Sequence, residues 1–235
     1  MARRRFFVPE IRGGTATLAG DEAHHLTRVL RVEKGQKYEI SDNREVWLAE
    51  VEAARRDLVT FRMLERVEAT EPPSRMVVYV ALIRFERIEL LVEKATELGV
   101  ERIVFFAAER SEKGLDRAAP KRLERWRRIA REASEQSRRV RLPEIGGLMA
   151  FQEALDTADG RLLLLDETPA GTPLLATLPA DRVSLLVGPE GGWTDRERAL
   201  AHEAGWRSVS LGPSILRAET AAIAALAVIH ATSCR

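Results

Sequence analysis

The stretch VSLLVGPEGGW, residues Val183 to Trp193, decides the fold. Its first half is a short run of apolar and small residues, which predicts a strand buried on both faces, as strands of parallel sheets are. Three glycines and a proline follow within the five positions 188–192 and leave one carboxylate, Glu190, among them. Glycine lets other atoms approach the backbone closely. We therefore interpret this segment either as a ligand-binding loop or as a plain turn.

A second glycine-containing loop, GPSILRAET (212–220), follows the expected strand WRSVSL (206–211). In open α/β sheets, ligands bind beyond the carboxyl ends of the strands. The two loops together therefore predict a pocket at that edge. The loop at 188–192 has no Gly-Lys-Ser/Thr sequence and no Gly-x-Gly-x-x-Gly spacing, so neither a Walker-type phosphate loop nor a dinucleotide fingerprint is indicated.

The chain from residue 74 to 235 alternates buried strands with amphipathic helices, which predicts an α/β layer with a mainly parallel sheet. The expected strands are 76–83, 102–108, 161–167, 183–188 and 206–211, and the expected helices are 86–98, 120–139, 194–205 and 219–231. Thr194 and Glu197 have the spacing of a capping box at the start of the third of these helices.

Residues 1–71 have a different pattern and predict a small β-barrel domain. The segments 37–42, 46–54 and 58–67 alternate or are rich in β-branched and aromatic residues, as antiparallel strands are, and a short helix is expected over 21–31. Two successive prolines at 72 and 73 suit a linker between this domain and the second domain, 74–235.

Composition bounds the class of protein. The chain has 235 residues, of which 45% are hydrophobic and 31% charged, with a net charge of only +1. The one cysteine, Cys234, excludes a disulfide within the chain. The basic start lacks an apolar segment behind it, and the longest apolar run, 221–229, is too short to span a bilayer. We expect a cytoplasmic protein without a membrane segment.

Positive charge gathers locally between Arg117 and Arg141, where ten Lys and Arg stand against three Glu. The segment's apolar residues recur at helical spacing, so its opposite face is basic and is either a solvated surface or a contact for RNA phosphates. Our candidates for RNA contact are Arg127, Arg128, Arg131, Arg138 and Arg139, with Arg3, Arg4, Arg5, Arg28 and Arg31 in the first domain. The adjacent His24 and His25 lack partners at ligand spacing, so no metal site is predicted.

Several stretches, in the same order along the chain, resemble the RsmE family of 16S rRNA uridine N3-methyltransferases, a branch of the SPOUT superfamily. They are RRRFFVP (3–9), HHLTRVLR (24–31), EKATELGVERI (93–103), ERSEKG (109–114), RWRRIAREASEQSRRVRLPEI (125–145), LLVGPEGGWTDRE (185–197) and SLGPSILRAETAAIAAL (210–226). The chain departs from the family's common pattern at Arg84, Phe85, Arg138 and Ser214, where lysine, glycine, glycine and arginine are frequent.

The resemblance implies a PUA-like barrel followed by a knotted SPOUT methyltransferase domain that binds S-adenosylmethionine and forms a homodimer. It implies methylation of uridine N3 in small-subunit rRNA, either free or in the assembled subunit. The closing helix, 219–231, is apolar on nearly all sides. Burial within one chain and a subunit interface both account for that pattern.

The resemblance also assigns site residues. The cofactor would lie against Leu165, Gly188, Pro189, Glu190, Gly191, Gly192, Leu211, Gly212, Ile215 and Leu216. Glu190 would bond the ribose hydroxyls or satisfy N–H groups of its own loop. Arg217 and Glu219 are the catalytic candidates, with Glu219 either taking the N3 proton or capping the last helix.

Two other functions are open to such a chain. A SPOUT enzyme that methylates ribose 2′-hydroxyls typically has asparagine at the start of the final helix, where this chain has RAET (217–220). A non-catalytic RNA-binding factor would use the barrel and the basic segment alone. The intact glycine loops favour an enzyme over such a factor.

Overall fold

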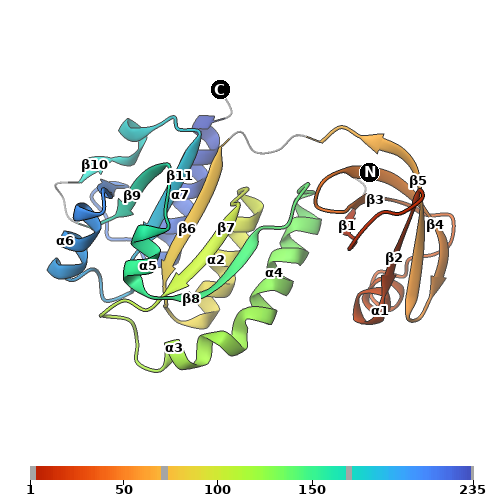
Figure 1. Cartoon of the computed structure of the whole chain (residues 1–235), viewed down its shortest axis with the longest axis horizontal. Coiled ribbons are helices and arrows are strands. Elements are labelled where there is room, and N and C mark those ends of the chain that lie inside the picture. The colour runs from red at the N-terminus through yellow and green to blue at the C-terminus, as the bar shows by residue number, and fades with distance from the viewer. Residues whose placement is uncertain (1–3, 70–73, 168–170, 234–235) are drawn as a thin grey trace. The chain divides into compact units, whose positions relative to one another are not determined.

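The computed structural model describes residues 4–69, 74–167 and 171–233 (Figure 1). The chain divides into two compact units. The first comprises Met1–Glu71 and Ser134–Leu142, and the second comprises Pro72–Ala133 and Pro143–Arg235. The segment 134–142, which the sequence assigned to the second domain, thus groups with the first.

The first unit is a five-stranded sheet with one helix. Its elements are β1 (Arg5–Phe7), β2 (Thr15–Ala19), α1 (Gly20–Arg28), β3 (Lys37–Ser41), β4 (Val46–Arg55) and β5 (Leu58–Val67). The strand order is β1-β3-β4-β5-β2, with antiparallel pairs except for the parallel pair β1–β3. No pairing joins β1 to β2 among residues 4–69, so hydrogen bonds do not close the sheet into a barrel. Phe6, Ile40 and Phe61 lie fully buried in its core.

A buried ion pair fixes the segment 134–142 to this sheet. The guanidinium of Arg5 donates to the Glu39 carboxylate at 2.8 Å, and both residues are buried. Arg138 pairs with the same carboxylate, and its backbone carbonyl accepts a hydrogen bond from Arg5. Nearby, the N–H of Leu142 donates to the side chain of Asn43 at 2.9 Å.

This ion-pair cluster corrects the expectation that Arg5 contacts RNA. Arg5 is 3% exposed, so its charge is spent within the protein and is out of reach of a phosphate. Arg138 keeps an exposed side chain but shares the Glu39 carboxylate. Its backbone is left-handed, with φ of 57°, which explains why glycine suits this position.

The second unit contains a parallel sheet in the order β10-β12-β9-β11-β6-β7-β8. The strands are β6 (Arg75–Ala81), β7 (Arg102–Phe106), β8 (Glu144–Met149), β9 (Arg161–Leu165), β10 (Thr172–Pro173), β11 (Arg182–Val187) and β12 (Arg207–Ser210). The helices are α2 (Phe85–Glu97), α3 (Leu115–Ala118), α4 (Leu123–Gln136), α5 (Phe151–Asp156), α6 (Asp195–Glu203) and α7 (Ala218–Ser233), with 3-10 turns at Ala119–Arg122 and Leu174–Thr177. From β6 the chain first adds β7 and β8 on one side of the sheet and then continues on the other side of β6, where β9, β10, β11 and β12 lie.

Helices cover both faces of this sheet (Figure 1). Alternate residues of β6 point to opposite sides: Val78 and Val80 join the core formed with α2, α4 and α7, while Tyr79 joins the core formed with α5 and α6. Such two-sided burial explains why the strands read as continuous apolar runs. After β12, near one edge of the sheet, the chain returns so that α7 packs against α2 and β11.

Most expected elements of the second unit are present, and the capping box of Thr194 and Glu197 forms at α6. The short α5 and the strand β8 were not anticipated from the sequence. The paired glycines 146 and 147 in β8 conceal its strand pattern. Within the described residues, none of the helices combines the length and apolarity needed to cross a bilayer.

We expect Glu39→Ala to destabilise the first unit by about 3–5 kcal/mol, because the buried Arg5 loses its carboxylate partner. Urea unfolding followed by circular dichroism measures the loss. The matched control is Glu50→Ala, whose partner Arg62 has a side chain 52% exposed, so less than about 1 kcal/mol should be lost. Equal losses in the two variants would contradict the structural role of Glu39.

Candidate active site

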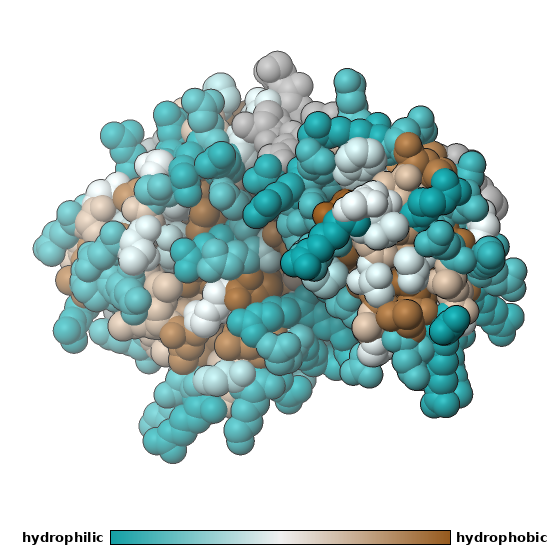
Figure 2. Space-filling model, turned by 45° about the vertical axis from the view of Figure 1, so that its right-hand side comes forward, coloured by the Kyte–Doolittle hydropathy of each residue, from teal (hydrophilic) through white to brown (hydrophobic). Residues whose placement is uncertain are grey.

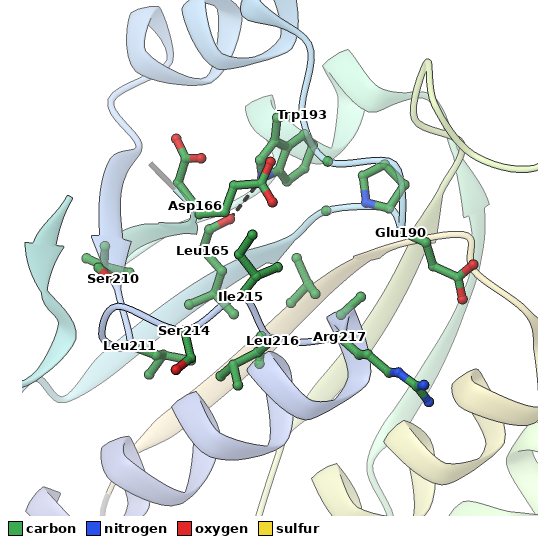
Figure 3. A pocket seen from close by; sticks show the side chains of 18 of the residues that line it. Leu165, Asp166, Glu190, Trp193, Ser210, Leu211, Ser214, Ile215, Leu216 and Arg217 are labelled. Carbon is green, nitrogen blue, oxygen red and sulfur yellow. Dashed lines mark hydrogen bonds between the residues drawn. The ribbon is translucent and has the colours of Figure 1, made fainter. Parts of the chain in front are cut away.

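A pocket of about 270 Å³ lies at the carboxyl ends of β9, β11 and β12. Its walls come from these strand ends, from the loop 211–217 and from the first turns of α2 and α7 (Figure 3). The lining residues are Arg87, Leu165, Asp166, Glu167, Val187, Gly188, Pro189, Glu190, Gly192, Trp193, Val209, Ser210, Leu211, Gly212, Pro213, Ser214, Ile215, Leu216, Arg217, Ala218 and Ala221. All the expected cofactor residues are among them except Gly191.

The glycines of the first loop are needed for internal packing. A Cβ on Gly188 would lie 2.8 Å from the indole of Trp193, and one on Gly192 would lie 2.8 Å from a Glu167 oxygen. A Cβ on Gly191 would lie 3.0 Å from the side chain of Arg110. The side of the backbone on which a Cβ would stand is thus occupied by the protein's own side chains, while Gly188 and Gly192 also line the pocket.

Trp193 ties the first loop to the neighbouring strand. Its indole N–H donates to the carbonyl of Leu165 at 2.9 Å, shown as a dashed line in Figure 3. The ring is 3% exposed and stacks near Phe106 and Phe151 on the α5 side of the sheet. This hydrogen bond therefore ties the segment after β11 to the end of β9 at the floor of the pocket.

The second loop presents open backbone to the pocket. Gly212 has φ of +125°, and a Cβ there would meet no atom within 4 Å. Among the residues that the structure describes, Ser214, Ile215 and Leu216 use no backbone N–H or C=O group in a hydrogen bond. Ile215 is 81% exposed although it is large and apolar. Free donors and acceptors beside apolar side chains suit a flat heteroaromatic ring.

One end of the pocket carries a group of charges. Arg87, from α2, forms an ion pair with Glu190, and its Nε lies 3.8 Å from Oε1 of Glu219. Glu219 is 5% exposed and does not line the pocket, and its Oε2 has no hydrogen-bond partner. Arg217 is exposed at the mouth, and Figure 3 shows its side chain extending to the same side as Glu190. Sequence reasoning did not identify Arg87.

Two acidic residues after β9 border the opposite end. The carboxylate of Asp166 accepts hydrogen bonds from Arg198 at 3.1 Å and Ser208 at 3.3 Å, while Glu167 is exposed beside Gly192. These residues were also missed. Two acids directly after a buried strand are a signal that could have indicated them, because strand ends line the ligand edge of such sheets.

The basic helix α4 buries Trp126 and Ala130 as its apolar spacing predicts. Arg125 is drawn toward α2, where its hydrogen bonds hold the pKa of Glu89 below its usual value. Arg122 lies over the ring of Phe85, with its Cζ 5.2 Å from the ring centre. Phe85 is one of the positions at which this chain departs from the glycine that is frequent in the family, so this contact depends on that departure.

The other candidate RNA contacts differ in their surroundings. Arg127 and Arg128 are exposed and, among the described residues, pair with Glu124 and Glu132 of their own helix, while Arg131 and Arg139 are half-buried. Arg4, Arg28 and Arg31 are exposed on the first unit, and Arg3 lies outside the described residues. Figure 2 shows hydrophilic side chains over most of the face in view, with smaller apolar patches between them.

Comparison with known proteins places this site in a family. Residues 70–230 match the family described as RNA methyltransferase domain, and residues 18–64 match an RNA methyltransferase PUA domain. The chain belongs to the ribosomal RNA small subunit methyltransferase E family. Named members include proteins of Synechocystis, 38% identical over 98% of this chain and 78% of its own length, and of Aquifex aeolicus, 30% identical over 95% and 97%.

Solved structures of this methyltransferase family agree over nearly the whole chain. A methyltransferase E from Neisseria gonorrhoeae, solved bound to S-adenosylmethionine, has a TM-score of 0.89 at 30% identity and 98% coverage of both chains. A putative methyltransferase from Legionella pneumophila, also solved with this cofactor, has a TM-score of 0.88 at 30% identity, again with 98% of both chains covered. The expected α/β methyltransferase domain preceded by a PUA-like domain is confirmed.

We expect Gly188→Ala to destabilise the second unit by about 1–3 kcal/mol, because the new methyl group overlaps the Trp193 indole. Thermal unfolding measures the change, and near-ultraviolet circular dichroism reports the displaced ring. Gly147→Ala is the control, since a Cβ there meets nothing within 4 Å. If both variants unfold alike, Trp193 does not depend on the bare backbone of Gly188.

Proposed function

We propose that this protein transfers a methyl group from S-adenosylmethionine to N3 of a uridine in 16S rRNA. The observation that carries the proposal lies at the carboxyl edge of the sheet. There the backbone N–H and C=O groups of Ser214–Leu216 are unpaired, beside the loop 188–192 that Trp193 connects to β9. The pocket volume, about 270 Å³, is near the lower end of the range for small-molecule sites.

The residues present suit this cofactor. The unpaired N–H and C=O groups of Ser214, Ile215 and Leu216 would read the edge of the adenine ring. Apolar side chains of Leu165, Leu211, Ile215 and Leu216 would cover its faces, and Gly212 would let it approach the backbone. The loop Gly188–Gly192, held by Trp193, would contact the ribose and methionine parts. When bound, the cofactor supplies an electrophilic methyl group on sulfur.

The protein's own task is to hold a uracil ring in line with that methyl group and to stabilise the charge that forms on the ring oxygens. The target base must leave its stack for this alignment, so a single-stranded or flipped uridine is the expected substrate. Arg217, exposed at the mouth, is a candidate cation for a uracil oxygen. Glu190 pairs with Arg87, which favours a role in orienting that arginine besides any bond to ribose.

RNA would be gripped by exposed cations on both units. The exposed Arg127 and Arg128 would contact phosphates from α4, together with the half-buried Arg131, and Arg4, Arg28 and Arg31 would do so from the first unit, together with the half-buried Arg139. Arg5 is withdrawn from this surface because it is buried. Ribosomal RNA as substrate implies work in the cytoplasm.

The family relationship further supports a homodimer and a knotted chain. The return of the chain after β12, which brings α7 against α2 and β11, is the kind of path from which a knot arises. Several apolar residues of α7, among them Ile223 and Val228, are only partly buried, and a second subunit would cover them. A dimer mass in light scattering at micromolar concentration would support the pairing, and a monomer mass would refute it.

Nucleoside mass spectrometry of rRNA treated with the protein tests the reaction, and 3-methyluridine is the expected product. Calorimetry with S-adenosylhomocysteine tests the pocket: Ile215→Ala should weaken binding about 10-fold, by loss of apolar contact worth about 1.5 kcal/mol. Val29→Ala, which truncates another exposed apolar residue on the first unit, should leave binding unchanged. A 2′-O-methylated nucleoside as product would instead establish the ribose methyltransferase, and absence of ligand binding would favour an RNA-binding factor.

We expect the triple change of Arg127, Arg128 and Arg131 to alanine to weaken RNA binding and to reduce its salt dependence. With each phosphate contact removed, fewer counterions are released when RNA binds. The slope of log K against log salt should therefore become less steep by roughly 0.7–0.9 per contact. Filter binding over a salt series measures both. The affinity for S-adenosylhomocysteine should stay constant. If RNA affinity and slope are both unaltered, this face of α4 is only solvated.

A further inference from the structure

Arg87 is held in place by two carboxylates that come from different elements. Glu190 approaches it from the loop after β11, and Glu219 from the first turn of α7. Its side chain is 24% exposed, so the guanidinium is partly removed from water yet faces the pocket that it lines. Two ion pairs fix its position before any ligand arrives.

Glu219 is badly placed to meet the substrate itself. Its side chain is 7% exposed, it does not line the pocket, and its contact with Arg87 runs to 3.8 Å. Its Oε2 has no hydrogen-bond partner, so this oxygen does not cap the N–H groups at the start of α7. A buried carboxylate with an unused oxygen is costly unless a cation compensates it. Among the described residues, the only cation paired with it is Arg87.

The position of Arg87 favours the substrate base over the cofactor. Arg87 pairs with Glu190, and Figure 3 shows Glu190 and Arg217 toward one end of the pocket and Leu211 and Ser214 toward the other. Arg84, one turn earlier, also approaches Glu190, at 4.0 Å, and is 63% exposed. Arg87 thus lines the pocket behind the more exposed Arg84 and beside Arg217, and a nucleotide entering at this end would meet it.

We propose that Arg87 is the catalytic cation that stabilises the uracil anion during methyl transfer, and that Glu219 acts through it as a positioning residue. The inference rests on the proposed function and names a residue for it. In the reaction the N3–C bond forms as the S–C bond breaks, the electron pair of that bond stays on sulfur, and the N3 proton passes to solvent water. Arg87 donates to the ring oxygen on which negative charge accumulates.

A double-mutant cycle separates this role from proton removal by Glu219. Arg87→Gln should lower kcat by about 100-fold to 1,000-fold, the effect of removing one preorganised donor. Glu219→Gln should lower it by a smaller factor, because Arg87 is still held by Glu190. The variant with both changes should be no slower than Arg87→Gln alone, since Glu219 has nothing left to position.

Three readouts besides turnover check the assignment. The pH dependence of kcat in Glu219→Gln should keep the shape of the wild-type profile at a lower level. Arg87→Lys should recover part of the rate, because it restores a cation but loses the planar fork. Calorimetry should give S-adenosylhomocysteine affinities within about 3-fold of wild type for Arg87→Gln, where a residue that holds the cofactor would lose about 10-fold or more.

The control is Lys94→Gln, which removes a positive charge from the same helix α2 at a half-buried site paired with Glu93 and Glu97, away from the pocket lining. It should leave turnover unchanged. Effects of Arg87→Gln and Glu219→Gln that multiply, or loss of the acid limb in Glu219→Gln, would overturn the inference and make Glu219 the base. Lost cofactor affinity in Arg87→Gln would overturn it too. If the wild-type protein forms no 3-methyluridine, the proposed function itself fails.

Discussion

The hydrogen bond from Trp193 to the carbonyl of Leu165 is the contact on which the site depends. It joins the ends of two neighbouring parallel strands through a side chain that fits only because Gly188 lacks a Cβ. Gly192 is required for a different reason, since its φ of +71° is a conformation that other residues rarely adopt. Gly188 is therefore needed for packing against Trp193, and the pocket lies beyond the strand ends that this packing connects.

A second constraint is which arginines form ion pairs with carboxylates of other elements and which remain exposed to solvent. Arg5, Arg125 and Arg87 each form ion pairs with carboxylates, although Arg5 and Arg125 stand in stretches of the sequence that are rich in arginine. Arg127 and Arg128, by contrast, are exposed with partners only on their own helix. A charge held by a buried carboxylate is preorganised and gives geometry, while a charge in water gives salt-dependent attraction. The protein separates these two uses.

The sequence predicted the second unit well because its strands are buried on both faces and its helices have continuous apolar stripes. It predicted the capping box at Thr194 from spacing alone. It did not predict β8, where glycines interrupt the strand pattern, or the three-residue strand β1. Nor did it reveal that 134–142 packs with the first unit, since that grouping depends on the pairing of Glu39 with Arg138, residues far apart in the chain.

By itself, the sequence determined the alternating α/β order, the two loops and the family, because periodicity and motif spacing are local properties of the chain. The tertiary structure decided which residues meet. Arg87 and Glu219 come together only because α7, which follows the strand near the sheet edge, returns to pack on α2. Burial of Arg5 and the unused oxygen of Glu219 were equally invisible in the sequence, since partners and solvent exposure are set by contacts between distant segments.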